Sequence, residues 1–189
     1  MRLESGRTLL LCVLMAPALV AGDGQTVWES ADRATKRLAP SAFVDLPAAI
    51  RKELGRRGCT IPQPFGATRR RNAIKGHFTS ARQVDWAILC SVRRTSTILV
   101  FRHGSPTDVA EIAALLDSTF LQQLSEGTIG YSRALGVANA ESIRVQFERH
   151  GGPTPPPLDH DGIDDAFVEK GSSVWYWDGG RWLQLTGTD

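Results

Sequence analysis

The sequence lacks any apolar run long enough to cross a membrane as a helix. Its longest, residues 8–20, falls short of the roughly 20 residues that such a span requires, so we expect no membrane span in the mature chain. The run follows a short basic stretch and precedes the small residues Ala21 and Gly22. This three-part pattern is typical of a secretory signal peptide. It predicts residues 1–22 as a signal, with export to the periplasm or the medium; an uncleaved N-terminal anchor is the alternative.

Cysteine is scarce, with three residues in the chain. Cys12 lies inside the predicted signal, which leaves Cys59 and Cys90 in the mature protein. No C-x-x-C motif is present, which excludes the common thioredoxin-like redox site. An isolated pair in an oxidising compartment predicts a disulfide. Closing the loop between Cys59 and Cys90 would stabilise the fold by about 3–4 kcal/mol in the chain-entropy model. Two buried free thiols are the alternative.

Catalytic signatures are also lacking. The chain has no glycine-rich phosphate loop, no nucleophile elbow and no paired-glutamate motif. Its four histidines do not have the spacing of a metal site or a catalytic triad. We therefore expect a non-catalytic binding or structural module that meets a protein or a glycan at the cell envelope. The alternative is an envelope-directed hydrolase in which His160, Asp161 and Asp165 supply the acid–base groups.

Neither sign of charge dominates, because the formal net charge is +2, but the charges are unevenly distributed. Residues 28–103 hold 15 Lys and Arg against 5 Asp and Glu, whereas residues 158–189 hold 2 against 7. The densest basic run is residues 69–71. A nucleic-acid site requires such charges clustered with stacking aromatic rings, and export removes that partner. We therefore predict a solvated basic loop and no nucleic-acid partner.

Four aspartates crowd into residues 159–165, directly after a proline run. Aligned on Gly162, this stretch resembles the middle of a calcium-binding EF-hand loop, but the carboxylates that such a loop needs at its two ends are missing. A looser calcium site formed by Asp159, Asp161 and Asp165 is one hypothesis. The other is that Asp159 or Asp161 caps a short helical turn, while the remaining carboxylates face solvent or basic residues.

Aromatic residues gather near the C-terminus, where two strand-like segments within residues 172–186 flank the pair Gly179–Gly180. The pattern predicts a β-hairpin. A two-residue turn at these glycines would place Trp177 opposite Trp182, whereas a three-residue turn would place Tyr176 opposite Trp182. Alternation places Trp175 and Trp177 on one face. We expect at least one face of the hairpin to pack in the core. The other hypothesis is that Trp175, Trp177 and Trp182 form an aromatic surface that stacks on a sugar or anchors a protein partner.

The remaining pattern predicts one α+β domain over residues 23–189, in which a mostly antiparallel sheet is covered by two or three helices. Helices are expected at 28–39, at 45–58 with Asp45 as the cap, and from about Thr107 to residue 120. Strands are expected at 72–78, 84–91, 96–102 and 128–134. Residues 139–150 fit either a strand or a helix, and residues 151–158 form a proline-rich connector.

Residues 76–88, GHFTSARQVDWAI, resemble one FG-GAP (VCBS-type) repeat loop, in which a G-D-F-N-G-D-G-x-x-D-x-A-V motif between two strands binds calcium. The residues at matching positions are Gly76, Phe78, Asp85, Ala87 and Ile88. The family's first three ligand positions carry His77, Thr79 and Ala81. The resemblance thus implies a strand–loop–strand with Asp85 as the one acidic ligand retained, and no calcium bound by this loop alone. The chain as a whole also resembles small exported bacterial proteins.

Overall fold

The structure, a computed structural model, describes residues 23–124 and 127–188. The predicted signal peptide, residues 1–22, lies outside this range. The helices are α1 (Asp23–Ala34), α2 (Ala48–Arg56) and α3 (Ala140–His150), and the short 3₁₀ turns are η1 (Pro40–Ala42), η2 (Arg102–Gly104) and η3 (Asp117–Phe120). None of the described helices is long and apolar enough to cross a membrane.

The strands of the described residues form two four-stranded and two two-stranded antiparallel sheets. In spatial order, the first large sheet contains β3 (Ala73–Gly76), β4 (Asp85–Val92), β5 (Thr95–Phe101) and β6 (Val109–Leu116). The second contains β12 (Arg181–Thr186), β11 (Gly171–Asp178), β10 (Gly162–Phe167) and β9 (Arg133–Ala138). The short pairs are β1 (Arg37–Leu38) with β2 (Ile61–Pro62), and β7 (Leu121–Gln123) with β8 (Ile129–Tyr131). The predicted α+β class is confirmed, although the strands divide into several sheets.

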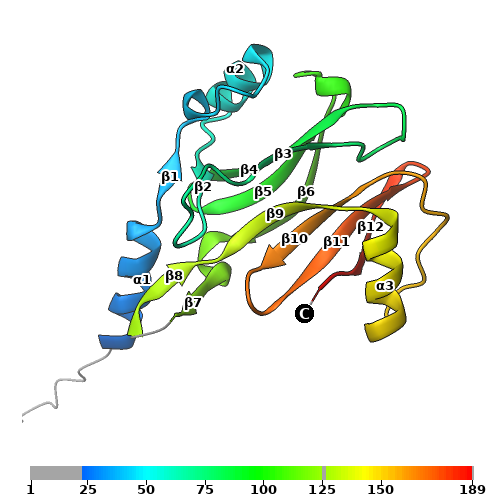
Figure 1. The fold of residues 1–189 in the computed structure, drawn as a ribbon. Helices are drawn as coiled ribbons and strands as arrows, with labels where there is room; N and C mark the ends of the chain where they lie inside the picture. Colours follow the sequence, from blue (N-terminus) through cyan, green and yellow to red (C-terminus); the bar gives the residue numbers. More distant parts are fainter. Residues whose placement is uncertain (1–22, 125–126, 189) are drawn as a thin grey trace, which may run out of the picture.

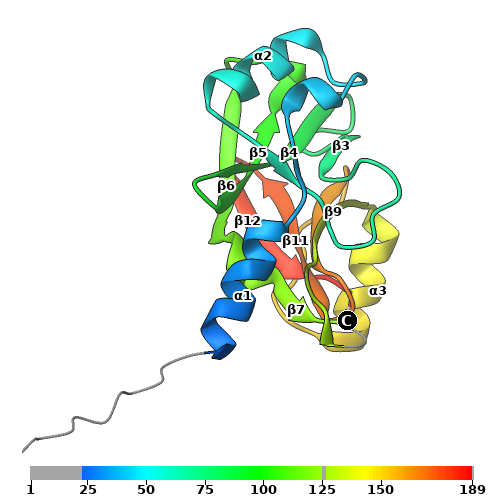
Figure 2. The ribbon, with the colours of Figure 1, turned by 90° about the vertical axis from the view of Figure 1, so that its left-hand side faces the viewer.

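The two large sheets pack face to face, and one helix covers the outer face of each (Figures 1 and 2). Their shared core contains Leu89 and Ile98 from the first sheet and Leu135 and Ile163 from the second. The layers therefore run helix, sheet, sheet, helix. A strand in the middle of such a stack is covered on both faces, which explains why β4 is a nearly continuous apolar run.

Helix α2 covers the first sheet. Its residues Ile50 and Leu54 are fully buried against a cluster that includes Ile88 of β4. Just beyond the helix, Cys59 forms the predicted disulfide with Cys90, their Cα atoms 5.1 Å apart. The disulfide therefore ties the chain that leaves α2 to the middle of the first sheet.

Residues 139–150, which fit two structures by sequence, contain helix α3. The Asn139 side chain caps the helix, because its oxygen accepts a hydrogen bond from the Ser142 amide at 2.8 Å. Ile143 is buried and packs against Val174 of β11. Helix α3 therefore covers the outer face of the second sheet.

The helix predicted from about Thr107 to residue 120 is wrong, because β6 occupies most of this segment. Ile112 pairs with Ile98 of β5, and the register then shifts at a bulge where Ala113 has a φ of +54°. An inserted residue keeps apolar side chains on one face but breaks their period of two. The resulting apolar spacing imitates that of a helix.

Two predicted helix caps are also wrong. Helix α2 begins directly after Pro47, which makes no side-chain cap, so Asp45 lies outside the helix. After the proline-rich connector the chain enters β10 at Gly162, and it makes no helical turn between Asp159 and that strand. β10 pairs with β9 on one side and β11 on the other, and this pairing holds the segment extended.

Candidate functional site

The two large sheets are joined along one side. There β3 and β9 lie next to each other, and the buried Asn72 links the segments around them. Its side-chain nitrogen donates to the carbonyls of Pro62 at 2.7 Å and Arg133 at 3.0 Å. Its side-chain oxygen accepts from the Leu135 amide at 2.9 Å. The opposite side ends in the edge strands β6 and β12, and a groove lies between the sheets on that side.

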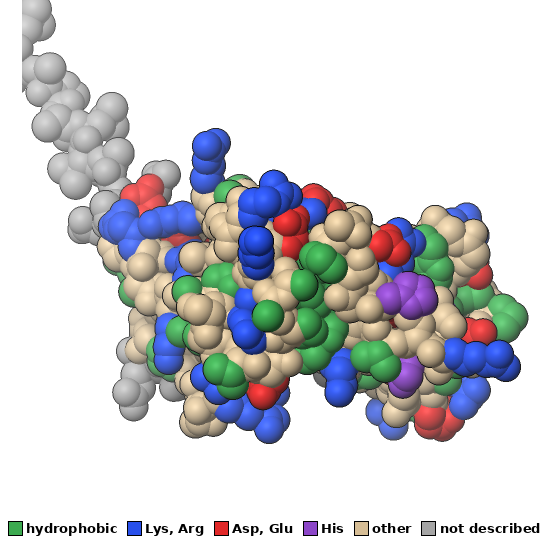
Figure 3. Space-filling view, turned by 90° about the horizontal axis from the view of Figure 1, so that it is seen from above, with side chains coloured by type: hydrophobic (Ala, Val, Ile, Leu, Met, Phe, Trp, Pro, Cys, Tyr) green, Lys and Arg blue, Asp and Glu red, His purple; other side chains and the backbone are tan. Residues whose placement is uncertain are grey.

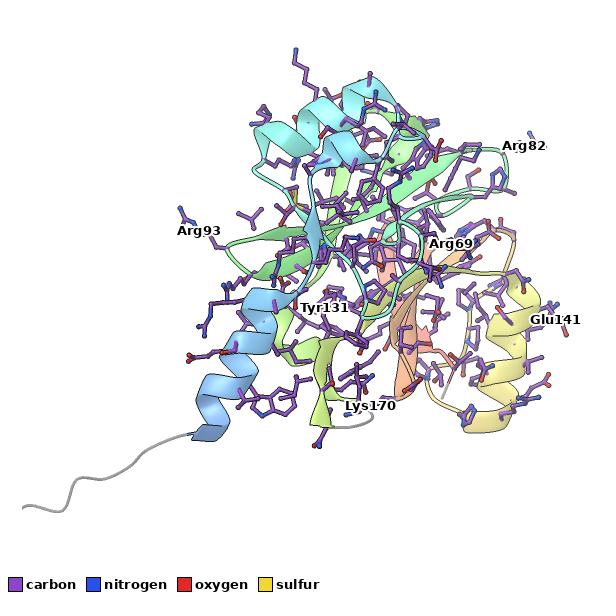
Figure 4. The ribbon with its side chains drawn as sticks, turned by 60° about the vertical axis from the view of Figure 1, so that its left-hand side comes forward. Arg69, Arg82, Arg93, Tyr131, Glu141 and Lys170 are labelled. Carbon is purple, nitrogen blue, oxygen red and sulfur yellow. A yellow bond between two sulfur atoms is a disulfide. The ribbon has the colours of Figure 1, made fainter. Side chains whose placement is uncertain are left out.

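This groove has a volume of about 660 Å³ and runs between β6 and the inner face of β10–β12. Its lining includes Ala113, Asp165, Phe167, Ser173, Trp175 and Gln184. Lys170 lies at its rim in the turn between β10 and β11 (Figure 4), with Nζ 4.9 Å from the centroid of the Phe167 ring. A mostly apolar lining with a few polar groups is typical of ligand sites.

Asp165 is the carboxylate of the groove. The fully buried Arg133 donates from Nε to Oδ1 and from Nη2 to Oδ2, each at 2.8 Å. Arg133 is itself held by the carbonyls of Ser96 at 3.2 Å and Ala113 at 2.9 Å. Trp175 Nε1 lies 3.4 Å from Oδ2. A carboxylate accepts about four hydrogen bonds, so Asp165 keeps acceptor capacity for a ligand.

The predicted C-terminal hairpin is present, and its register is that of the two-residue turn. Trp177 pairs with Trp182 and Trp175 with Gln184, so the three tryptophans share the inner face of the second sheet, and each is half-buried. Trp177 and Trp182 meet edge to face with ring centroids 5.4 Å apart, and Trp182 packs against the core between the sheets. Of the three, Trp175 lines the groove. The predicted aromatic surface is therefore divided between groove and core.

His160 lies outside the groove, on the segment that precedes β10. Its ring stacks on Tyr176 with centroids 4.3 Å apart, and burial raises the pKa of Tyr176. His160 Nδ1 is 2.9 Å from the Asp161 carbonyl oxygen, and Nε2 is 3.1 Å from the Trp177 carbonyl oxygen. These contacts fasten the proline-rich connector to β11.

The three aspartates considered as a calcium site have separate partners. Asp159 accepts from the Tyr176 hydroxyl at 3.2 Å, and Asp161 accepts from the His77 amide at 3.0 Å. Asp165 pairs with Arg133. In residues 23–124 and 127–188, no three His, Cys, Asp or Glu side chains form a group that could hold a metal ion.

The three residues considered as a hydrolase cluster are also divided. Asp165 lines the groove, whereas His160 lines a separate polar cavity of about 340 Å³ near Tyr176. Asp161 uses one carboxylate oxygen on the His77 amide. The arrangement therefore provides no common position for a substrate between these groups.

Asp85, the acidic residue of the FG-GAP-like loop, is buried and fully occupied by protein donors. Its Oδ2 accepts from the Phe78 amide and from both the amide and the hydroxyl of Thr79, at 2.7–3.1 Å. Its Oδ1 accepts from Gln83 Nε2 at 2.6 Å and the His103 amide at 2.9 Å. These donors stand around the carboxylate where a cation would otherwise bind, and they order the loop between β3 and β4.

Arg133 is the residue of the groove that sequence reasoning missed. It lies in a predicted strand, where an arginine is usually solvent-facing, yet here it is fully buried. The sequence does hold a signal, because Arg133 alternates in phase with the apolar Leu135. Asp165 likewise alternates in phase with the apolar Ile163. Using that signal requires the register of β9 on β10, which pairs Leu135 with Asp165.

On the open side of the two sheets, the groove therefore combines the Trp175 indole, the Asp165 carboxylate and the Gln184 side-chain amide. Arg133 holds the carboxylate in place. Comparison with known proteins found no matching family model, no matching curated protein and no matching solved structure.

Proposed function

We propose that this protein is an exported binding module of the cell envelope and that its ligand is a glycan seated in the groove between β6 and β10–β12. The observation that carries the proposal is the position of the Trp175 indole beside the Asp165 carboxylate. A sugar ring presents a face of C–H groups and a rim of hydroxyls. It therefore suits an aromatic ring combined with a hydrogen-bond acceptor.

The carboxylate is held in place before any ligand arrives. Arg133 fixes both oxygens of Asp165, and the bulge carbonyl of Ala113 fixes Arg133. A group whose orientation is set in advance loses less conformational entropy when it binds. Asp165 can therefore accept a hydroxyl hydrogen bond without a change of rotamer.

Gln184 supplies a second polar group. Its Nε2 donates to the Ser173 hydroxyl at 2.9 Å, which orients the amide and leaves Oε1 to accept a hydrogen bond. Lys170 at the rim adds donors. The groove thus offers acceptors and donors around one indole face, a combination that fits a neutral or weakly acidic sugar.

Export is part of the same proposal. Cys59 and Cys90 are joined in a disulfide and are nearly fully buried, and structural disulfides of this kind are typical of oxidising compartments. The signal-like pattern at residues 1–22 gives the route. We expect the mature protein recovered from outside the cytoplasm to lack about 22 N-terminal residues. Intact-mass measurement checks this, and a full-length mass with free thiols would contradict it.

Binding can be tested by calorimetric titration with soluble peptidoglycan fragments and with cello-, chito- and malto-oligosaccharides. One of these glycans should bind the native protein. Trp175→Ala should weaken that binding by about tenfold or more, since stacking and burial of an aromatic ring contribute on the order of 1–3 kcal/mol. Gln184→Ala should weaken it less.

Trp177→Phe is the matched control, because Trp177 lies on the same strand and face but does not line the groove. It should leave the affinity unchanged. Equal binding by the Trp175→Ala variant, or a larger loss in the control than in that variant, would move the ligand site away from the groove. Circular dichroism of each variant verifies that it is folded.

A further inference from the structure

A second candidate site lies where the chain after α1 meets the loop between β2 and β3. The two segments are held together because the backbone amide of Gln63 donates to the backbone carbonyl of Lys36 at 2.8 Å. A cavity of about 290 Å³ lies there, lined in part by Lys36, Gln63, Arg69 and Arg70. Figure 4 shows Arg69 on this loop. No residue of this cavity lines the groove described above.

The loop that carries the two arginines is clamped by a buried amide side chain. Gln63 is 4% exposed. Its Nε2 donates to the carbonyls of Ile61 at 3.1 Å and Arg71 at 3.0 Å, and its Oε1 accepts from the Arg71 amide at 2.8 Å. The next residue, Asn72, is fully buried. The backbone that presents Arg69 and Arg70 is therefore fixed at its C-terminal end.

The cations of this cavity are not neutralised within the described chain. Lys36, Arg69 and Arg70 form no ion pair there, and no Asp or Glu lines the cavity. The adjacent Arg37, in contrast, pairs with Asp32 and Asp117. Three cations at one cavity repel each other and attract an anion. Two guanidinium forks and an ammonium favour phosphate, which accepts several charge-assisted hydrogen bonds at once.

An apolar cavity of about 340 Å³ adjoins the basic one, and Lys36, Gln63 and Ala67 line both. Its other lining residues include Phe65 and Ile129. Phe65 is 61% exposed, yet its amide donates to the Tyr131 carbonyl at 2.7 Å. An exposed aromatic side chain on a held backbone, beside unneutralised cations, forms a surface with one basic and one apolar end.

We propose that these joined cavities bind a phosphate-bearing amphiphile, with the phosphate at Lys36, Arg69 and Arg70 and the first carbons of its apolar chain against Phe65 and Ile129. Charge complementarity favours the phosphate at one end of the joined cavities, and the adjoining apolar cavity favours the apolar chain at the other. The site is independent of the glycan groove, and neither proposal needs the other to hold.

The test is calorimetric titration with three probes: inorganic phosphate, octyl phosphate below its micelle concentration, and the neutral, sugar-free tetraethylene glycol monooctyl ether. Octyl phosphate should bind at least about tenfold more tightly than inorganic phosphate, because each buried methylene adds to the affinity. The octyl ether should bind more weakly than octyl phosphate. In thermal melts, phosphate should raise the melting temperature more than chloride at equal ionic strength.

Two double variants that remove the same charge distinguish binding at this cavity from attraction by the overall positive charge. Arg69→Gln with Arg70→Gln should weaken octyl phosphate binding by about tenfold or more. Arg82→Gln with Arg93→Gln removes the same charge from two residues that point outward elsewhere (Figure 4), and it should change nothing. Phe65→Ser should weaken octyl phosphate but not inorganic phosphate.

Three results would overturn the proposal. Equal losses in the two double variants would mean that the general positive charge of the protein, and not this cavity, attracts the anion. The octyl ether binding as tightly as octyl phosphate would mean an apolar site without anion recognition. Octyl phosphate binding no more tightly than inorganic phosphate would show that the site does not bind the apolar chain. Melting of each variant without ligand verifies that it is folded.

Discussion

At the scale of single residues, Asp164 and Asp165 are neighbours in opposite environments, because successive side chains of a strand point to opposite faces. Asp165 faces inward, where Arg133 donates two hydrogen bonds to it. Asp164 faces the outer side, close to Gly136 of β9. Burial, with the charge of Asp165 adding to it, raises the pKa of Asp164. β10 therefore carries one carboxylate in an ion pair, Asp165, and one whose ionisation costs free energy, Asp164.

The raised pKa of Asp164 predicts a pH-dependent effect of Asp164→Asn. The stability associated with protonated Asp164 is fully present below the unfolded-state pKa of about 3.9 and is lost as the pH rises through the higher folded-state value. The uncharged variant should therefore melt above the native protein at pH 7 and level with it near pH 3. Thermal melts across this range check the prediction; a difference independent of pH would contradict it.

The residues that were predictable from sequence are those whose geometry is local or whose type is rare. Cys59 and Cys90 were the only cysteines left after the predicted signal, so their pairing needed no register. That Trp175 and Trp177 share one face followed from alternation alone. Arg133 depends on a partner 32 residues away, and two strands must be aligned before that partner can be identified.

At the scale of elements, the predictions failed where a tertiary feature changed the local period. β6 looked helical because the bulge at Ala113 shifts its alternation. That bulge also directs the Ala113 carbonyl to Arg133, so the irregularity supports the groove. The strands β3, β4 and β5 and the C-terminal hairpin matched their predicted positions to within a few residues. Short apolar runs separated by polar connectors mark β4 and β5, and a two-glycine turn marks the hairpin.

The α3 cap gives a prediction at this scale. Asn139→Ala should lower the free energy of unfolding by about 1 kcal/mol, because the Ser142 amide loses its acceptor. Asn139→Asp keeps an acceptor at the same place and should retain most of the stability. Urea denaturation compares the two. Since α3 lies on the outer face of the second sheet, glycan affinity should not change; equal stability of both variants would show that the cap contributes nothing.

At the scale of the whole molecule, the position of the groove follows from where the sheets meet and where they do not. Asn72 links them on the side of β3 and β9, and the groove lies on the side of β6 and β12. The uneven charge of the sequence does not produce a single-signed surface on the face seen from above, where Lys and Arg side chains lie among Asp and Glu (Figure 3). The glycan recognition that we propose for the groove therefore depends on local groups, above all Trp175 and Asp165.

The proposed function requires a glycan to bind against the Trp175 indole. Its most direct test is the indole N–H spectrum of the ¹⁵N-labelled protein during titration with the glycan that calorimetry identifies, with the five tryptophan signals assigned by single Trp→Phe variants. We predict the largest shift at Trp175, and none at Trp28 on α1 or Trp86 on β4. A bound glycan that leaves the Trp175 signal in place, or that moves Trp28 or Trp86 most, would contradict the account.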